Sequence, residues 1–190
     1  MIANVAIDKL TVAEFHQMEF DDNDTDQYEL LDGELVKKKA PAPRHQRLVR
    51  KLLMNLQLYV EQTKAGEMFV APVDVFLDEF TAPQPDLVFV AQHQLDLITN
   101  DGIMGAPSLV VEIISPTSVY RDRVTKKALY ERFGIQEYWL VDPADAYIEI
   151  YALTSGQYTL LSAASAAEGT LQSTLLPDLK LDMALLFAGE

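Results

Sequence analysis

The segment Ser108–Ser115 reads SLVVEIIS and is apolar at almost every position. A strand with one face in water alternates apolar and polar residues, whereas a strand covered on both faces is apolar nearly throughout. The segment therefore predicts a central strand of a sheet with protein packed against each face. Residues 122–133 show a helical pattern that Gly134 should end, and the apolar segment Glu137–Val141 follows. This order of strand, helix and strand predicts an α/β fold.

The preceding part of the chain extends this core. Over residues 44–62, leucines recur at helical spacing, so that one face of a helix packs inwards. Two further segments, 68–77 and 85–91, are predicted strands. The order of elements is therefore helix, three strands, helix and strand. We expect an α/β sandwich with a mixed sheet, formed by a single domain over residues 1–190 with its core at about 44–142.

Shorter patterns at each end predict accessory elements. Thr11-Val-Ala-Glu14 is a capping box, which predicts a short helix from Thr11 to Met18. Asp32-Gly33 suits the tight turn of a hairpin, because this pair supplies the positive φ angles that the turn requires. Residues 147–161 predict a second hairpin and residues 182–188 a short helix. The predicted fold is a mixed sheet flanked by helices, with an N-terminal helix and hairpin and a C-terminal β-hairpin extension.

The composition excludes several classes of protein. The chain has no cysteine, which excludes disulfide scaffolds, thiol catalysis and thiolate metal sites, and its three histidines show no zinc-ligand spacing. Any metal must therefore be held by oxygen atoms. No apolar run approaches the roughly 20 residues of a membrane span, and the N-terminus lacks the pattern of a signal peptide. We expect a cytoplasmic protein without a membrane partner.

The net charge of −14 argues against a nucleic-acid partner, because an acidic surface repels phosphate. The distribution of the charge changes this expectation. Residues 35–60 contain seven lysines and arginines and no acid, and residues 121–132 contain five more basic residues. These two segments hold 12 of the 15 basic residues and predict contacts with DNA. Solvated helix faces and a loop are the alternative interpretation.

Two acids stand in apolar surroundings. Asp86 opens the apolar strand DLVFV, and Glu112 lies within LVVEII, where an ionised carboxylate is costly unless it is paired or bound to a metal. Pairing with a structural arginine is the alternative. If the two strands are adjacent, two like charges forced close together need a cation between them. With oxygen ligands only, Mg²⁺ or Mn²⁺ is the natural occupant.

A lysine is the third part of this hypothesis. Asp122, Lys126 and Tyr130 are spaced at i, i+4 and i+8, so they share one face of a helix. An ammonium near a bound metal positions water or stabilises charge that develops on phosphorus. An exposed Asp–Lys helix pair is the alternative, and spacing alone favours that alternative.

Seven motifs in a fixed order give the chain a wider resemblance. They are YELLDGEL (28–35), HQRLVRKL (45–52), PDLVFV (85–90), APSLVVEIISPTS (106–118), DRVTKKALY (122–130), FGIQEYWLVDP (133–143) and LLPDLKLDMALLF (175–187). On these residues the chain resembles the Uma-type restriction endonucleases, a bacterial family of the PD-(D/E)xK nuclease superfamily. The resemblance implies a restriction-endonuclease-like fold.

The resemblance also implies roles for single residues. Asp86 is implied as the motif aspartate and Glu112 as the motif glutamate, and both would be catalytic residues that hold the metal. The backbone carbonyl of Ile113 is implied as a further ligand. Glu29 is a candidate to complete the metal shell, with a polar strand residue as the alternative interpretation, and Asp74 is another candidate.

At one motif position the chain departs from the superfamily pattern. Two residues after Glu112 stands Ile114 instead of a lysine. The resemblance points to Lys126 on the following helix as the catalytic replacement, with Lys127 as the alternative. Phosphate contacts are expected from residues of the two basic segments, namely Arg44, His45, Arg47 and Arg123.

The leading hypothesis is a Mg²⁺- or Mn²⁺-dependent endonuclease that hydrolyses phosphodiester bonds in DNA. The alternative is a non-catalytic DNA-binding or protein-interaction module with the same fold, which the missing in-line lysine and the net charge favour. RNA and small phosphoesters are alternative substrates. A homodimer is expected from the resemblance, because many nucleases of this fold cut two strands as dimers.

Overall fold

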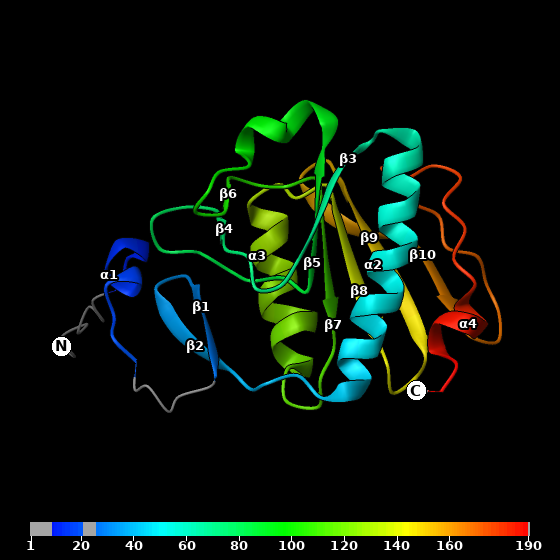
Figure 1. Cartoon of the computed structure of the whole chain (residues 1–190), viewed down its shortest axis with the longest axis horizontal. Helices are drawn as coiled ribbons and strands as arrows, with labels where there is room; N and C mark the ends of the chain where they lie inside the picture. The colour runs from blue at the N-terminus through cyan, green and yellow to red at the C-terminus, as the bar shows by residue number, and fades with distance from the viewer. Residues whose placement is uncertain (1–8, 21–25, 190) are drawn as a thin grey trace.

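The computed structural model describes residues 9–20 and 26–189 (Figure 1). At its centre lies a six-stranded sheet with the strand order β10-β9-β8-β7-β5-β3. β7 and β8 run parallel, whereas the other neighbouring strands are antiparallel, so the sheet is mixed, as predicted. The strands are β3 (Gly66–Val70), β5 (Leu87–Ala91), β7 (Leu109–Ile113), β8 (Glu137–Asp142), β9 (Tyr147–Thr154) and β10 (Gln157–Ser165).

β5 and β7 are interior strands of the sheet, and every residue of both is buried. Successive side chains of a strand point to opposite faces, so each face contributes to a separate layer of the core. One face packs against α2 (Pro43–Thr63) and α4 (Met183–Phe187), and the other packs against α3 (Lys127–Arg132). The central strand expected from SLVVEIIS is confirmed.

The first residues of α2 are placed at one end of the sheet. Pro43 is the first helical residue, where its missing N–H leaves no hydrogen bond unmade. The buried positions of the helix recur every three or four residues and face the sheet: Leu48, Val49, Leu52, Leu56 and Val60. This packing holds the basic start of α2 beside the start of β5 and the end of β7.

The prediction of one strand over residues 68–77 is wrong for the second half of this range. β3 ends at Val70, and after Pro72 the chain forms β4 (Val75–Phe76), which pairs with β6 (Ile103–Met104) in a separate two-stranded sheet. Proline has no N–H to donate to a strand ladder, so Pro72 ends the pairing of β3 with β5. The 3-10 helix η1 (Gln92–Leu97) and β6 lie in the connection between β5 and β7.

The accessory elements at the N-terminus match their predictions closely. α1 (Val12–His16) is capped by Thr11 with both hydrogen bonds of the capping box, although it ends two residues earlier than expected. β1 (Gln27–Leu31) and β2 (Glu34–Lys38) form the predicted hairpin. Its turn has positive φ at Asp32 and Gly33, as the sequence required. The hairpin joins the rest of the fold through a bridge between Leu30 and Ala82.

The helix predicted over residues 122–133 begins with a different pitch. Its first part, η2 (Arg121–Lys126), is a π-helix, and α3 continues from it to Arg132. Gly134 follows with φ +78°, which fits the predicted stop. π-helical turns occur frequently at functional sites. The wider turn still leaves Asp122, Lys126 and Tyr130 buried together.

At the C-terminus the predicted hairpin and helix are present as β9–β10 and α4, with the strands longer than expected. Within the described ranges, no helix combines the length and the apolar character that crossing a membrane would need. The signal-peptide prediction concerns an N-terminal stretch whose residues 1–8 lie outside the described residues.

Candidate active site

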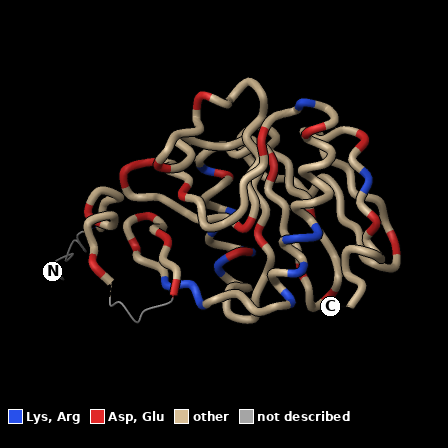
Figure 2. Tube along the Cα trace, viewed as in Figure 1, with Lys and Arg blue, Asp and Glu red and all other residues tan. Residues whose placement is uncertain are grey.

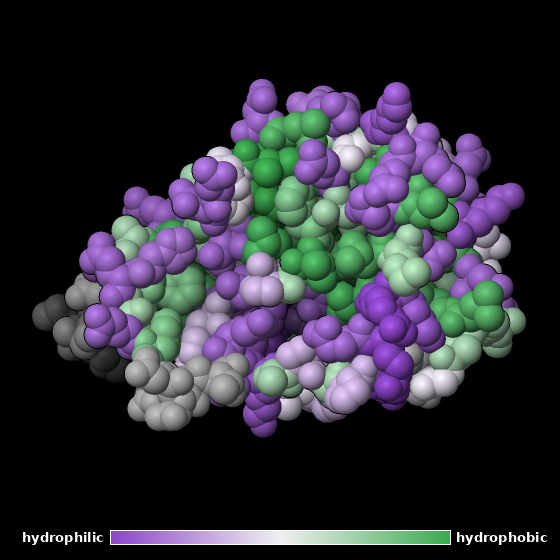
Figure 3. Space-filling view, in the orientation of Figure 1, coloured by the Kyte–Doolittle hydropathy of each residue, from purple (hydrophilic) through white to green (hydrophobic). Residues whose placement is uncertain are grey.

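A pocket of about 580 Å³ opens where β5 begins and β7 ends. The chain between β2 and α2, the start of η2 and the loop after β7 complete its wall. Figure 2 shows that lysines and arginines gather in the lower part of the molecule, around these segments, while acids are spread over the whole molecule. In the space-filling view, hydrophilic side chains surround a hollow in the same region (Figure 3).

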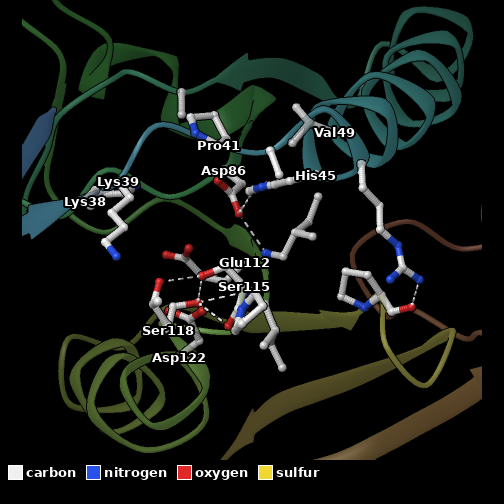
Figure 4. Close-up of a pocket in the computed structure, with 18 of the residues that line it drawn as sticks. Lys38, Lys39, Pro41, His45, Val49, Asp86, Glu112, Ser115, Ser118 and Asp122 are labelled. Atoms are coloured by element: carbon white, nitrogen blue, oxygen red, sulfur yellow. Dashed lines mark hydrogen bonds and ion pairs between the residues drawn. The ribbon is translucent and has the colours of Figure 1, made fainter. Parts of the chain in front are cut away.

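Asp86 and Glu112 meet in this pocket. β5 and β7 are antiparallel with Leu87 opposite Val111, so Asp86 and Glu112 occupy the next opposing positions. The two residues are only 8% and 3% exposed. One oxygen of Asp86, Oδ2, accepts a hydrogen bond of 2.7 Å from the backbone N–H of Ile113 (Figure 4). Both acids singled out from the sequence therefore line one site.

The proximity of these acids changes their electrostatics. Burial, followed by the repulsion from Glu112, raises the pKa of Asp86 to about 7. Lys38 and the N–H of Ile113 partly oppose this shift. At neutral pH the pocket thus carries two carboxylates that are difficult to ionise together, which is the arrangement that a bound cation relieves.

Lys126 lies against the same carboxylates and is 1% exposed. Its Nζ is 2.8 Å from Glu112 Oε1 and 2.8 Å from Glu29 Oε2, and the hydroxyl of Tyr130 donates to Glu112 Oε1 at 2.7 Å. Burial opposes the charged form of Lys126, but the neighbouring carboxylates outweigh burial and raise its pKa. Lys127 lies instead over the ring of Tyr151, 3.4 Å from its centroid, so Lys126 is the lysine that reaches the site.

Glu29 is fully buried and faces Lys126. Its Oε2 also accepts a hydrogen bond of 3.2 Å from the backbone N–H of Gln84. Burial opposes its ionisation, but Lys126 and Lys38 outweigh burial and lower the pKa of Glu29. The contacts of Glu29 thus balance the charge of Lys126, and its role as a metal ligand stays a prediction.

The donor atoms fit a hard cation that keeps part of its water shell. Asp86 Oδ1 and Glu112 Oε2 form no hydrogen bond with any residue that the structure describes. The described part of the chain contains no group of three or more His, Asp or Glu side chains placed to hold a metal. Mg²⁺ commonly binds through one or two carboxylates, several waters and substrate phosphates, so two carboxylates suffice. The ligand role of the Ile113 carbonyl stays a prediction.

Two of the four expected phosphate contacts lie at the pocket. His45 Nε2 is 3.2 Å from Asp86 Oδ2 without hydrogen-bond geometry, and Figure 4 shows the two side chains facing each other. Burial, together with the charge of Lys38, lowers the pKa of His45, so its ring is neutral at pH 7. Arg44 also lines the pocket, where it donates a hydrogen bond to the backbone oxygen of Pro143.

The other two do not line it. Arg47 is exposed on α2, outside the pocket wall. Arg123 lies behind the wall, where its guanidinium is 2.8 Å from Asp142, which lines the pocket, and 3.0 Å from Glu149, which does not. Asp74, a further ligand candidate, accepts a hydrogen bond from Gln84 and lies outside the wall as well.

Sequence reasoning also missed or underrated residues of the site. Arg121 and Ser118 line the pocket. Arg121 was included in the basic segment 121–132 but was not singled out as a phosphate contact, and Ser118 was not selected. Asp122, which was considered only as a partner of Lys126, is 2% exposed, and burial and the charge of Glu112 raise its pKa to about 7. The sequence signal that could have identified these residues is their position in the chain, since they lie just before Lys126. Buried acids are also more numerous than the two first identified, because Glu29, Asp122, Glu137 and Asp142 are buried too.

Comparison with solved structures defines the class of fold. The chain is similar to a crystal structure described as a putative nuclease belonging to DUF820 from Anabaena variabilis, with a TM-score of 0.76 and 17% identity. The match covers 94% of this chain and 98% of that one. This likeness shows a restriction-endonuclease-like fold.

The sequence then identifies the family. Residues 12–184 match the Uma2 family, which is described as "Putative restriction endonuclease", and the chain belongs to that family. The resemblance inferred from the motifs is confirmed. A search of curated proteins gives no match.

Proposed function

We propose that the protein is a metal-dependent endonuclease that hydrolyses phosphodiester bonds in DNA. The observation that carries this proposal is the meeting of Asp86 and Glu112 across two adjacent strands, with the buried ammonium of Lys126 against Glu112. The family and the fold support a nuclease, and the donor set supports Mg²⁺ or Mn²⁺ as its cofactor.

Asp86 and Glu112 would hold the cation through their open oxygens. Such a cation, when bound, lowers the pKa of a water molecule and neutralises phosphate charge. Lys126 keeps its proton at neutral pH, because the carboxylates around it raise its pKa. Its part is therefore to offset negative charge and fix Glu112, and it does not act as a base. Neutral His45, beside Asp86, would orient a water or a phosphate oxygen by hydrogen bonding.

The lysine also bears on the alternative of an inactive module. That alternative depended on the net charge and on Ile114, which occupies the position where the superfamily pattern has a lysine. Lys126 comes from the following helix and lies 2.8 Å from Glu112. The ammonium is therefore supplied from a different place in the chain, which supports an active enzyme.

The charge distribution supports DNA as the substrate despite the net charge of −14. The end of β2 and the start of α2 bring Lys38, Lys39 and Arg44 to the wall of the pocket. Acidic residues elsewhere repel DNA from the remaining surface, so this wall is the favourable approach.

The test is cleavage of supercoiled plasmid and labelled oligonucleotides with Mg²⁺ or Mn²⁺, using wild type, Asp86→Asn and Glu112→Gln. We expect cleavage by wild type and a loss of at least about a thousandfold in each variant, because each removes one of two metal-holding charges. Calorimetric titration of the metals into the same proteins should show binding to wild type only. Undiminished cleavage by either folded variant would contradict the assignment.

A further inference from the structure

Most cationic side chains at the pocket are already engaged by the protein. Lys126 is held between two carboxylates. Lys38 donates a hydrogen bond of 2.8 Å to the backbone oxygen of Gln84, and Arg44 donates one to that of Pro143. Donors that are occupied in this way have less capacity left to bind a ligand.

Arg121 differs from these cations. It is the first residue of η2, its side chain is 24% exposed, and it lines the pocket together with Asp86 and Glu112. Its Nε is buried and has no hydrogen-bond partner, and its guanidinium donates no hydrogen bond to any described residue. Lys39 also lines the pocket, but it lies exposed in the chain between β2 and α2.

The guanidinium of Arg121 is nevertheless held in place by charge. Its Nε lies 3.7 Å from Glu29 Oε1 and 3.9 Å from Asp122 Oδ1. These separations are too long for hydrogen bonds but short enough for attraction between a cation and two buried carboxylates. The buried Nε of Arg121 thus faces Glu29 and anchors the side chain, and the N–H groups of the two Nη atoms are the donors that stay available to a ligand.

From this combination we propose that Arg121 is a phosphate-binding residue of the pocket. A guanidinium presents a planar fork of donors that binds two oxygens of one phosphate group. The carboxylates of the pocket would repel a phosphate that arrived alone, so a cation beside them is required to admit it. For a phosphodiester substrate the inference rests on the proposed function, whereas for inorganic phosphate it does not.

The test measures binding without cleavage, in a chain that also carries Glu112→Gln. Fluorescence anisotropy with a labelled DNA duplex and ³¹P NMR titration with inorganic phosphate report on two phosphate probes. We expect Arg121→Gln to weaken both by about tenfold or more, because a charge-assisted double hydrogen bond is lost. Arg121→Lys should give an intermediate loss, since it keeps the charge but not the fork.

Arg132→Gln is the matched control. It removes the same charge from the same helical segment, at an exposed residue that pairs with Asp32 outside the pocket, and should change affinity by less than about twofold. Equal losses in both variants would show a nonspecific charge effect and overturn the proposal, as would unchanged binding by folded Arg121→Gln. If Arg121→Gln does not fold, Arg121→Lys is the deciding variant, and wild-type affinity in that variant would overturn the proposal.

Two further outcomes separate this proposal from the nuclease function. Absence of binding to both probes would overturn the Arg121 proposal. A wild type that binds the probes but never cleaves DNA would overturn the nuclease function and leave the Arg121 proposal intact.

Discussion

Glu112 on β7 and Glu137 on β8 are buried glutamates on adjacent strands, but they differ in the face of the sheet that they occupy and in their hydrogen-bond partners. Leu109 pairs with Glu137 in the parallel ladder, so Glu112, three residues further on, points to the other face of the sheet. Glu137 lies on the α2 face and accepts hydrogen bonds from neutral groups only. The donors are Trp139 Nε1, Ser173 Oγ, the Thr174 N–H and Oγ1, and the Leu175 N–H.

Both oxygens of Glu137 are therefore occupied, and its carboxylate fastens the C-terminal segment to the sheet. Glu112 has its hydrogen bonds on one oxygen only, from Lys126 and Tyr130. Its second oxygen has no partner among the described residues and lies in the pocket with Asp86. A buried carboxylate with every donor supplied is structural, whereas one with an open oxygen beside a second acid is prepared for a ligand.

Glu112 has a charged partner, Lys126, whereas Glu137 has none among the described residues, and removing this lysine should have the largest effect on activity of the changes considered in this comparison. We expect Lys126→Met to lower cleavage at saturating DNA by at least about a hundredfold, because the buried ammonium beside Glu112 is lost. Lys127→Gln, its neighbour over the Tyr151 ring, should change the rate by less than about twofold. Cleavage rates and thermal melting of both variants measure this, and a reversed order would assign the role to Lys127.

The next effect concerns stability and belongs to Glu137. Glu137→Gln places an NH₂ group against donors that need an acceptor, so the free energy of unfolding should fall by about 2–4 kcal/mol. The cleavage rate of the folded fraction should stay within about twofold of wild type, because Glu137 faces away from the pocket. Urea unfolding and cleavage assays test this separation. Loss of metal binding in the folded variant would show that the two glutamates are coupled.

The last effect is a dependence of stability on pH in the metal-free protein. The pKa of Asp86 is about 7 in the folded state, above its ordinary value of 3.8, so the folded protein binds this proton more tightly than the unfolded chain. The resulting stabilisation is present at low pH and is lost as pH rises from about 4 to about 7. Asp86→Asn cannot ionise, and its stability relative to wild type should rise across this window by up to about 1.4 kcal/mol per pH unit.

Urea unfolding with a metal chelator at several pH values measures this difference. Asp122 has a pKa near 7 as well, but it is present in both proteins and cancels from the comparison to first order. If the difference in unfolding free energy between the two proteins is constant with pH, then Asp86 ionises normally. Such a result would contradict the effect ascribed to its burial and to the repulsion from Glu112.

Much of the fold was predictable because it depends on local patterns. SLVVEIIS indicated the central strand, and Asp32-Gly33 indicated the hairpin turn whose two residues have positive φ. The failure at residues 68–77 has a local cause, since Pro72 interrupts what otherwise resembles one strand. The π-helical pitch of η2 had no signature in the spacing of its residues.

The site was predictable only in part. Asp86 and Glu112 were recognisable because a carboxylate within an apolar strand is costly. Arg121 was expected only as one of the five basic residues of segment 121–132, because an arginine at the start of a helix is ordinary until its Nε is found buried without a hydrogen-bond partner. Arg123 was selected instead, and its guanidinium is neutralised by Asp142 and Glu149.

The sequence by itself determined most of the elements, the family and the two acids, because periodicity and the cost of a charge in an apolar strand depend on neighbouring residues. Only the tertiary structure decided which charges meet. Glu29, Glu112 and Lys126 are far apart in the chain and gather within hydrogen-bond distance through the packing of a hairpin, a strand and a helix. On the other face of the sheet, the packing of residues 173–175 against β8 gives Glu137 four of its five neutral donors, whereas Glu112 keeps an open oxygen, because hydrogen-bond partners are set by contacts in space.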